Sequence, residues 1–291
     1  MKFLLDSGDP EEYREIAALA TQKGSSLWGA TTNPSLIAKK LTGKKITKEE
    51  AFALQKKIVL EILEIVPGAV SAEVYADNAT TADEMIAQGK DIATWHERIV
   101  VKLPTTYEGF IARTELRKEN IIINNTLVFS QEQIFAICLH EQIVSQQFSV
   151  QPAQWPSFIS PFVGRLDDIG LAGIDLVANG IKIKKLMTPE LWMLEASART
   201  AHHVREGEEL ESELITAPGK VYKEFFLGVT SPSQQTLERI PYWEPPESLR
   251  NLQTIEAFMS ALQSGELNIQ HDLTDKGLVK FAEDWNNLIA A

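Results

Sequence analysis

Residues 99–104 read Ile-Val-Val-Lys-Leu-Pro, a run of apolar and β-branched residues with one lysine near its end. Such a run is typical of a buried strand, and the proline marks where the strand gives way to a loop. We therefore predict a strand over Ile99 to Lys102. Burial there disfavours the charged form of the Lys102 amine, and a neutral amine is what Schiff-base chemistry on a carbonyl requires. The alternative is a lysine whose ammonium reaches water past the strand end.

The same pattern, a short apolar run followed by an amphipathic helical stretch, recurs on both sides of this strand. The predicted strands are Phe3–Leu5, Leu27–Thr31, Val70–Tyr75, Ile99–Lys102, Ile121–Thr126 and Phe158–Phe162, with Leu191–Glu195 and Glu213–Thr216 as the best candidates for two more. Helix starts lie between the strands, at the capping residues Asp9, Thr47, Thr81 and Ser130. Strands that alternate with single helices form a parallel sheet.

The first two-thirds of the chain already contain six strands that alternate with helices. This number favours a closed barrel over an open doubly wound sheet. No strand is followed by a glycine-rich phosphate loop or a dinucleotide fingerprint, which argues against the open-sheet nucleotide enzymes. We therefore predict an α/β fold, a single (β/α)8 TIM barrel over residues 1–291 with a C-terminal helical extension. A proline-rich segment from about 228 to 270, with a helix from about Ser248 to Leu262, interrupts the alternation and is interpreted as an insertion.

The composition narrows the class of protein. The chain has 291 residues, of which 44 % are hydrophobic, and its net charge of −12 argues against binding to nucleic acid or to an anionic membrane. The single cysteine, Cys138, stands among apolar residues and is expected to be a buried structural thiol. We expect no membrane span, no signal peptide and a cytoplasmic location. Five glutamates between Glu206 and Glu213 predict a solvated helix face or loop.

The reacting groups of a (β/α)8 barrel gather at the carboxyl ends of its strands, and most of the predicted strands end in polar residues. In chain order these are Asp6, Asn33, Glu73, Lys102, Asn124 with Thr126, Ser160, Arg165, and Ser197 with Arg199. Attack of Lys102 on a ketone gives an imine, which is an electron sink for cleaving the neighbouring carbon–carbon bond. The carboxylates of Asp6 and Glu73 can then move protons.

The remaining polar strand ends suit binding. Sugar hydroxyls suit Asn33, Asn124 and Ser160, and a phosphate suits the charge-assisted donors Arg165 and Arg199 together with Ser197.

Each of these residues also has a structural explanation. Asp6 and Asn33 are of the types that cap helices, and Glu73 can form a structural ion pair with Lys102. Arg165 can pair with Asp167 or Asp168, Arg199 can be a surface arginine, and Thr126 can be an ordinary strand residue. Their convergence around one lysine favours a function, because a barrel mouth gains no stability from seven polar strand ends.

Longer motifs surround these residues: LDSGD at 5–9, GATTNPSL at 29–36, VVKLPTTYEG at 100–109, NNTLVFS at 124–130, SPFVGRLDD at 160–168, ASAR at 196–199 and HDLTDKGL at 271–278. Together they resemble the transaldolase family, and more narrowly its short microbial branch, which also contains the fructose-6-phosphate aldolases. The resemblance covers nearly the whole chain except about 228 to 270.

The resemblance implies a role for each residue. Lys102 matches the Schiff-base lysine, Asp6 the acid/base carboxylate, and Glu73 with Thr126 the pair that positions a catalytic water. Asn33, Asn124 and Ser160 match hydroxyl-binding positions, and Arg165, Ser197 and Arg199 match the phosphate site.

The reaction that the resemblance implies belongs to the pentose phosphate pathway. A dihydroxyacetone unit moves from sedoheptulose 7-phosphate or fructose 6-phosphate to glyceraldehyde 3-phosphate or erythrose 4-phosphate. The only partners implied are these small sugar phosphates, and neither a metal nor an organic cofactor is implied.

Two positions favour the transferase over the aldolase of the same branch. The pattern that the aldolases of this branch resemble has a tyrosine at the position of Phe162. It has a glutamine at the position of Glu73. Phenylalanine cannot donate the proton that releases a three-carbon intermediate, so the intermediate should wait for an aldehyde acceptor. A fructose-6-phosphate aldolase and a non-catalytic sugar-phosphate-binding protein stay as the alternatives.

Two features depart from the family pattern. Asn125 stands where the family usually has an apolar residue, and strand alternation turns it toward the helix layer, where it threatens packing more than chemistry. In the short branch the C-terminal helix, here about Gly277 to Asn287, reaches a neighbouring subunit of a large ring. The insertion before that helix could redirect it, so the formation of a homo-oligomer stays open.

Overall fold

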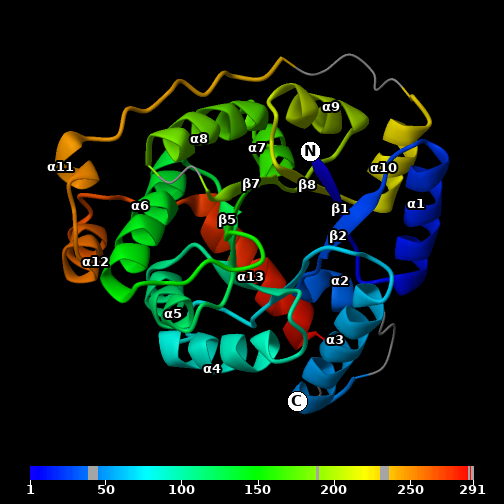
Figure 1. The fold of residues 1–291 in the computed structure, drawn as a ribbon, viewed down its shortest axis with the longest axis horizontal. Helices are drawn as coiled ribbons and strands as arrows, with labels where there is room; N and C mark the ends of the chain where they lie inside the picture. The colour runs from blue at the N-terminus through cyan, green and yellow to red at the C-terminus, as the bar shows by residue number, and fades with distance from the viewer. Residues whose placement is uncertain (39–44, 188–189, 230–235, 288, 290–291) are drawn as a thin grey trace.

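Eight parallel strands form a closed barrel in the computed structural model, which describes residues 1–38, 45–187, 190–229, 236–287 and 289 (Figure 1). The strands pair in the order of the sequence, and the last pairs with the first. They are β1 (Lys2–Asp6), β2 (Leu27–Thr31), β3 (Val70–Glu73), β4 (Ile99–Pro104), β5 (Ile123–Val128), β6 (Phe158–Pro161), β7 (Trp192–Glu195) and β8 (Leu214–Ala217). The predicted (β/α)8 fold is confirmed, and each predicted strand is present with ends that differ by at most two residues.

Long helices follow the strands and surround the barrel (Figure 1). They are α1 (Pro10–Gln22), α3 (Lys48–Leu63), α4 (Ala82–Ala93), α5 (Tyr107–Lys118), α6 (Gln131–Phe148), α8 (Gly173–Met187), α9 (Ala201–Glu209) and α10 (Gly219–Phe226). The predicted caps start four of them: Asp9 accepts from the Glu11 N–H, and Thr47, Thr81 and Ser130 each form a capping box. Each cap gives a partner to a backbone N–H that the first helical turn leaves without one.

Two short helices stand directly after strands, at the carboxyl end of the barrel. They are α2 (Pro34–Ala38), which follows β2, and α7 (Val163–Asp167), which follows β6. They carry Ser35 and Arg165 to the mouth of the barrel, where both side chains line a cavity.

The barrel interior is apolar toward the amino ends of the strands and polar toward their carboxyl ends. The apolar layer contains Leu4, Val100, Phe158 and Leu214, with tryptophans packed beside it. The residue two positions further along each of these strands is polar: Asp6, Lys102, Ser160 and Thr216. Because side chains alternate along a strand, both members of each pair point to the same face. The polar groups therefore meet at the mouth, above an apolar floor.

The predicted insertion interrupts the alternation as expected, but its helix is divided. Instead of one helix from Ser248 to Leu262, the structure has α11 (Glu247–Arg250) and α12 (Ile255–Ser264). The break falls before Thr254, whose side chain accepts from the Ala257 N–H and so starts a second helix. Residues 230–235 of the insertion, which include Pro232, lie outside the described residues.

The insertion runs along the outside of the helix ring, past α8 and α6 (Figure 1). Side chains of these helices hold its backbone: Asn179 donates to the Ile240 carbonyl over 3.0 Å, and Gln131 donates to the Pro241 carbonyl over 2.8 Å. Phe258 of α12 then packs edge-on against Phe110 of α5, with 5.2 Å between the ring centroids. The insertion thus carries the chain around the barrel rather than over it.

The last helix, α13 (Asp272–Asn286), crosses the barrel opening (Figure 1). Thr274 near its start donates to the Leu127 carbonyl at the end of β5, over 2.9 Å. Ser35 of α2 donates to the Asp284 carboxylate near its other end. The C-terminal helix therefore packs on its own barrel. None of the helices in the described ranges is long and apolar enough to cross a membrane.

Three sequence expectations concern packing outside the mouth. Cys138 is fully buried, and burial raises the pKa of its thiol to about 12, as expected of a structural cysteine. Asn125 is buried without disrupting the layer, because its amide donates to the Phe158 carbonyl over 2.8 Å. The solvated face predicted over residues 206–213 is wrong at two positions: Glu206 is half-buried, and Glu213 pairs with the buried Lys184.

Candidate active site

Lys102 is held inside the barrel rather than extending to water. Its ammonium Nζ lies 2.9 Å from Glu73 Oε2, and only about 5 % of either side chain is exposed. The two residues face each other because β4 pairs with β3 in a register that aligns Lys102 with Glu73. Lys102 Nζ also donates to the Thr32 carbonyl over 3.2 Å. The structure thus contradicts the alternative of an ammonium that reaches water past the strand end.

Burial changes the acid strength of Glu73. Removal from water raises the pKa of its carboxyl group, and the Lys102 ammonium only partly offsets that increase. A glutamate with a raised pKa accepts and returns a proton more readily near neutral pH than one in water. The pair therefore places the Lys102 nitrogen directly beside a group that can exchange protons with it.

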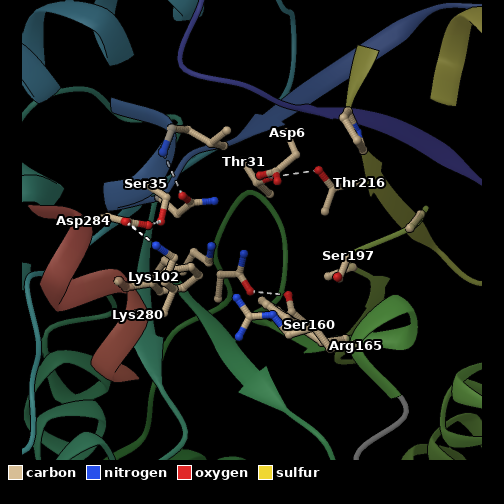
Figure 2. A pocket seen from close by; sticks show the side chains of 18 of the residues that line it. Asp6, Thr31, Ser35, Lys102, Ser160, Arg165, Ser197, Thr216, Lys280 and Asp284 are labelled. Atoms are coloured by element: carbon tan, nitrogen blue, oxygen red, sulfur yellow. Dashed lines mark hydrogen bonds and ion pairs between the residues drawn. The ribbon is translucent and has the colours of Figure 1, made fainter. Parts of the chain in front are cut away.

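A cavity of about 740 Å³ opens at the carboxyl ends of the strands (Figure 2). The predicted site residues that line it are Asp6, Asn33, Lys102, Asn124, Ser160, Phe162, Arg165, Ser197 and Arg199. The lining formed by the described residues leaves out Glu73 and Thr126. The Thr126 hydroxyl is fully buried and has no hydrogen-bond partner among the described residues.

Asp6 lies at the end of β1, next to two threonines (Figure 2). Thr31 donates its hydroxyl to the Asp6 carboxylate over 2.7 Å, and 2.6 Å separates the hydroxyls of Thr31 and Thr216. Asn33 has the helix-capping role that its residue type allows, since its side-chain oxygen accepts from the Leu36 N–H over 3.0 Å. Asn33 also lines the cavity, so capping and access to a ligand coexist in this residue.

A chain of hydrogen bonds orients the amide of Asn124. The amide nitrogen donates to the Ser71 hydroxyl over 3.0 Å, and the amide oxygen accepts from the Ser160 hydroxyl over 2.5 Å. All three side chains are buried. Two neighbours therefore hold Asn124 and Ser160 in fixed orientations at the cavity wall.

Arg165 of α7 lines the cavity (Figure 2). Its guanidinium lies near two aromatic rings. The guanidinium carbon is 5.3 Å from the Phe162 ring and 5.4 Å from the Phe281 ring. Burial and the nearby Arg199 both lower the pKa of Arg165. Among the described residues no carboxylate forms an ion pair with Arg165, so the predicted alternative of a pair with Asp167 or Asp168 is wrong.

Arg199 behaves differently, because it pairs with Asp168 over 3.1 Å and about half of its side chain is exposed. Two guanidiniums that repel each other beside a cavity favour an anion between them.

The last helix supplies residues that the sequence did not single out. Lys280, Phe281 and Asp284 of α13 line the cavity, and Lys280 pairs with Asp284 over 2.6 Å (Figure 2). The Phe281 ring lies 5.8 Å from Lys102 Nζ. An amphipathic helix pattern does not reveal which part of the barrel the helix will cover, so the sequence carried no usable signal here. Thr31 and Thr216, by contrast, follow the strand-end rule that identified the other residues.

Comparison with known proteins agrees with this geometry. The family model for transaldolase/fructose-6-phosphate aldolase matches residues 3–291. A probable transaldolase of Thermus thermophilus is 32 % identical over 289 residues, with 99 % of each chain covered. One from Caulobacter vibrioides is 31 % identical over 285 residues, covering 98 % of this chain and 96 % of that protein. One from Streptococcus equi is 36 % identical over 222 residues, covering 76 % of this chain and 88 % of that protein. The chain therefore belongs to the transaldolase/fructose-6-phosphate aldolase family.

Proposed function

We propose that this protein is a transaldolase of the pentose phosphate pathway, which moves a dihydroxyacetone unit between sugar phosphates through an imine on Lys102. The donors are sedoheptulose 7-phosphate and fructose 6-phosphate, and the acceptors are glyceraldehyde 3-phosphate and erythrose 4-phosphate. The observation that carries the proposal is the buried pair of Lys102 and Glu73 beside a cavity that also contains the guanidinium of Arg165.

The reaction begins when Lys102 Nζ attacks the ketone carbon, and loss of water from the carbinolamine then gives the imine. Asp6 accepts the proton of the hydroxyl next to the carbon–carbon bond that breaks. The electron pair of that bond moves into the imine, which becomes an enamine, and the aldose leaves. The enamine carbon next attacks the aldehyde of the acceptor, whose oxygen takes the proton back from Asp6. Water finally releases the new ketose and restores the amine.

Glu73 and Thr126 serve the two steps in which water leaves and returns. The raised pKa of Glu73 lets it give a proton to the departing hydroxyl of the carbinolamine and take one from the attacking water. The buried hydroxyl of Thr126, which lacks a partner among the described residues, is free to hold that water.

The arginines hold the phosphate of the sugar. Arg165 supplies a guanidinium with no ion-pair partner among the described residues, and Arg199 supplies a second one with the Ser197 hydroxyl beside it in the lining. Asn33, Asn124 and Ser160 bind the hydroxyls between the phosphate and the ketone.

Phe162 supports the transferase over the aldolase. It is buried at the cavity wall against Arg165, and its ring offers no proton to the three-carbon enamine. Without that proton the enamine persists until an aldehyde arrives. The aldolase and the non-catalytic binding protein make different predictions in the test that follows.

The test is mass spectrometry of the protein after borohydride reduction in the presence of fructose 6-phosphate, with and without erythrose 4-phosphate. We expect a three-carbon adduct on Lys102 that disappears when the aldose phosphate is added. Lys102→Met is the control and should show no adduct. Release of free dihydroxyacetone without an acceptor at a rate close to that of transfer would establish the aldolase instead. Binding of the sugar with no adduct would establish a binding protein.

A further inference from the structure

His203 of α9 lies behind the phosphate site and touches both segments that build it. Its ring Nδ1 accepts a hydrogen bond from the backbone N–H of Arg199 over 3.0 Å. Its Nε2 lies 2.7 Å from Asp167 Oδ2, and only 4 % of the His203 side chain is exposed. Asp167 belongs to α7, the helix that also carries Arg165.

These two contacts determine where the ring carries its proton. Because Nδ1 accepts from a backbone N–H, it holds no proton of its own. The ring proton is therefore on Nε2, which donates to the Asp167 carboxylate. Each ring nitrogen thus has its own partner, and the ring links the Ser197–Arg199 segment to α7.

The segment from Ser197 to Arg199 needs such support, because its backbone is not in a relaxed conformation. Ser197 has a φ of +60°, which lies in the left-handed region that residues other than glycine seldom occupy. The segment also packs directly on α7. A Cβ atom added to Gly164 would lie 2.2 Å from the Ser197 carbonyl oxygen and 2.5 Å from Arg199 Cγ.

Hydrogen bonds rather than tight packing hold the His203 ring from behind. A second cavity, of about 180 Å³, is lined by His203, Asp167 and Glu206, and Leu237 and Arg239 of the insertion also line it. Asp167 itself is anchored, since its Oδ1 accepts from the Gly173 N–H over 2.9 Å. The chain from Gly173 through Asp167 and His203 to Arg199 therefore fixes the distance between the two arginine-bearing segments.

We infer that His203 is a positioning residue of the phosphate site: it holds the Ser197–Arg199 segment against α7, so that Arg165 and Arg199 converge on one anion. This inference rests on the proposed function, which assigns these arginines to a phosphate. His203 contacts the backbone of Arg199, so its effect on the ligand is indirect. Small displacements of an oriented charged group cost much of its binding energy.

The first test measures the affinity of the full-length protein for inorganic phosphate by calorimetry. His203→Gln keeps a donor near Nε2 for Asp167 but leaves the Arg199 N–H without an acceptor, so we expect phosphate to bind about ten-fold more weakly. His203→Asn places an oxygen near Nδ1 and should retain more affinity than His203→Gln. His202→Gln is the matched control, because this neighbouring histidine is partly exposed and pairs only with Glu206 in the described part of the chain.

The second test separates positioning from a general loss of structure. Dihydroxyacetone carries no phosphate, so the yield of its reduced adduct on Lys102 should be the same in His203→Gln and in the unmodified protein. The KM for fructose 6-phosphate should rise in this variant while kcat changes less. Asp167→Asn should act like His203→Gln, because the amide donates to Nε2 and moves the ring proton to Nδ1, where it opposes the Arg199 N–H.

The outcomes distinguish this inference from the proposed function. Equal phosphate affinity in the unmodified protein and in His203→Gln would overturn the inference while leaving the lysine chemistry intact. A lower adduct yield with dihydroxyacetone would also overturn it, because the variant would then disturb more than the phosphate site. If the unmodified protein binds phosphate but forms no adduct with any ketose, the proposed function fails and the phosphate comparison still decides the role of His203.

Discussion

Under the proposed function, Phe162 decides whether the bound three-carbon enamine is released or transferred to an acceptor. Its ring lies against Arg165 and edge-on to Phe129, with 5.5 Å between the ring centroids. Phe162→Tyr adds a hydroxyl to a side chain that lines the cavity, and this hydroxyl can direct a proton to the enamine. We expect the release of free dihydroxyacetone from fructose 6-phosphate without acceptor to rise about ten-fold or more. An enzyme-coupled assay for dihydroxyacetone measures it, and an unchanged rate would show that Phe162 does not control release.

Glu195 is a buried carboxyl group that the proposed mechanism does not use. Neither of its oxygens has a hydrogen-bond partner among the described residues, and burial, with Glu206 and Asp167 nearby, raises its pKa well above that of a glutamate in water. The folded protein therefore holds a proton that the unfolded chain releases above about pH 4.3. Stability is lost as the pH rises from that value toward the raised pKa, by about 1.4 kcal/mol per pH unit for one proton.

The loss of stability with rising pH leads to a prediction for the variant Glu195→Gln. The variant needs no proton to fold, so we expect it to be more stable than the unmodified protein at pH 7 and to lose this advantage near pH 4. Urea unfolding at several pH values measures the difference. Glu208→Gln, an exposed change on α9, serves as the control and should run parallel to the unmodified protein. A difference between Glu195→Gln and the unmodified protein that does not vary with pH would contradict this account.

At the scale of elements, α13 forms part of the cavity wall and is fastened at its far end by Asp284. The Asp284 carboxylate accepts from Ser35 of α2 and pairs with Lys280 one turn back on α13. Asp284→Ala removes both contacts, so we expect faster hydrogen exchange in the last turns of α13 and a KM for fructose 6-phosphate raised about five-fold. Hydrogen exchange with mass spectrometry and steady-state kinetics measure the two effects.

The neighbouring residue Glu283 provides the control for this change. It is exposed on the same turn of α13, and Glu283→Ala should leave the exchange and the KM as they are. If the two variants behave alike, the contacts of Asp284 do not hold the helix in place.

The same helix shows where sequence reasoning reaches its limit. Alternation and capping are local signals, and they predicted every strand and the starts of four long helices. The strand-end rule predicted where the side chains around Lys102 gather, because a parallel barrel brings all carboxyl ends together. The division of the insertion helix before Thr254 and the docking of α13 over the mouth depend on tertiary contacts between residues far apart in the chain. Lys280 and Asp284 were therefore missed.

At the scale of the whole molecule, the charge of the cavity opposes the charge of the protein. The chain carries a net charge of −12, yet Arg165, Arg199 and Lys280 all line the cavity. An anionic ligand approaching this protein meets overall repulsion, so its binding depends on a few cations concentrated in one place. This distribution agrees with a small phosphorylated substrate and explains why net charge alone says little about the site.

The buried ion pair of Lys102 and Glu73 at the barrel mouth is expected to contribute little to the stability of the whole molecule. Breaking a buried ion pair leaves one charge without a partner and costs about 3–5 kcal/mol, whereas replacing both members with neutral groups is often neutral or stabilising. We therefore expect Glu73→Gln and Lys102→Met each to lower the melting temperature. The double variant should melt at or above the temperature of the unmodified protein, although it cannot form an imine. Thermal unfolding of the unmodified protein, the two single variants and the double variant measures the four melting temperatures. A double variant less stable than both single variants would contradict this account, because the two losses would then accumulate and a lone buried charge would not be what destabilises each single variant.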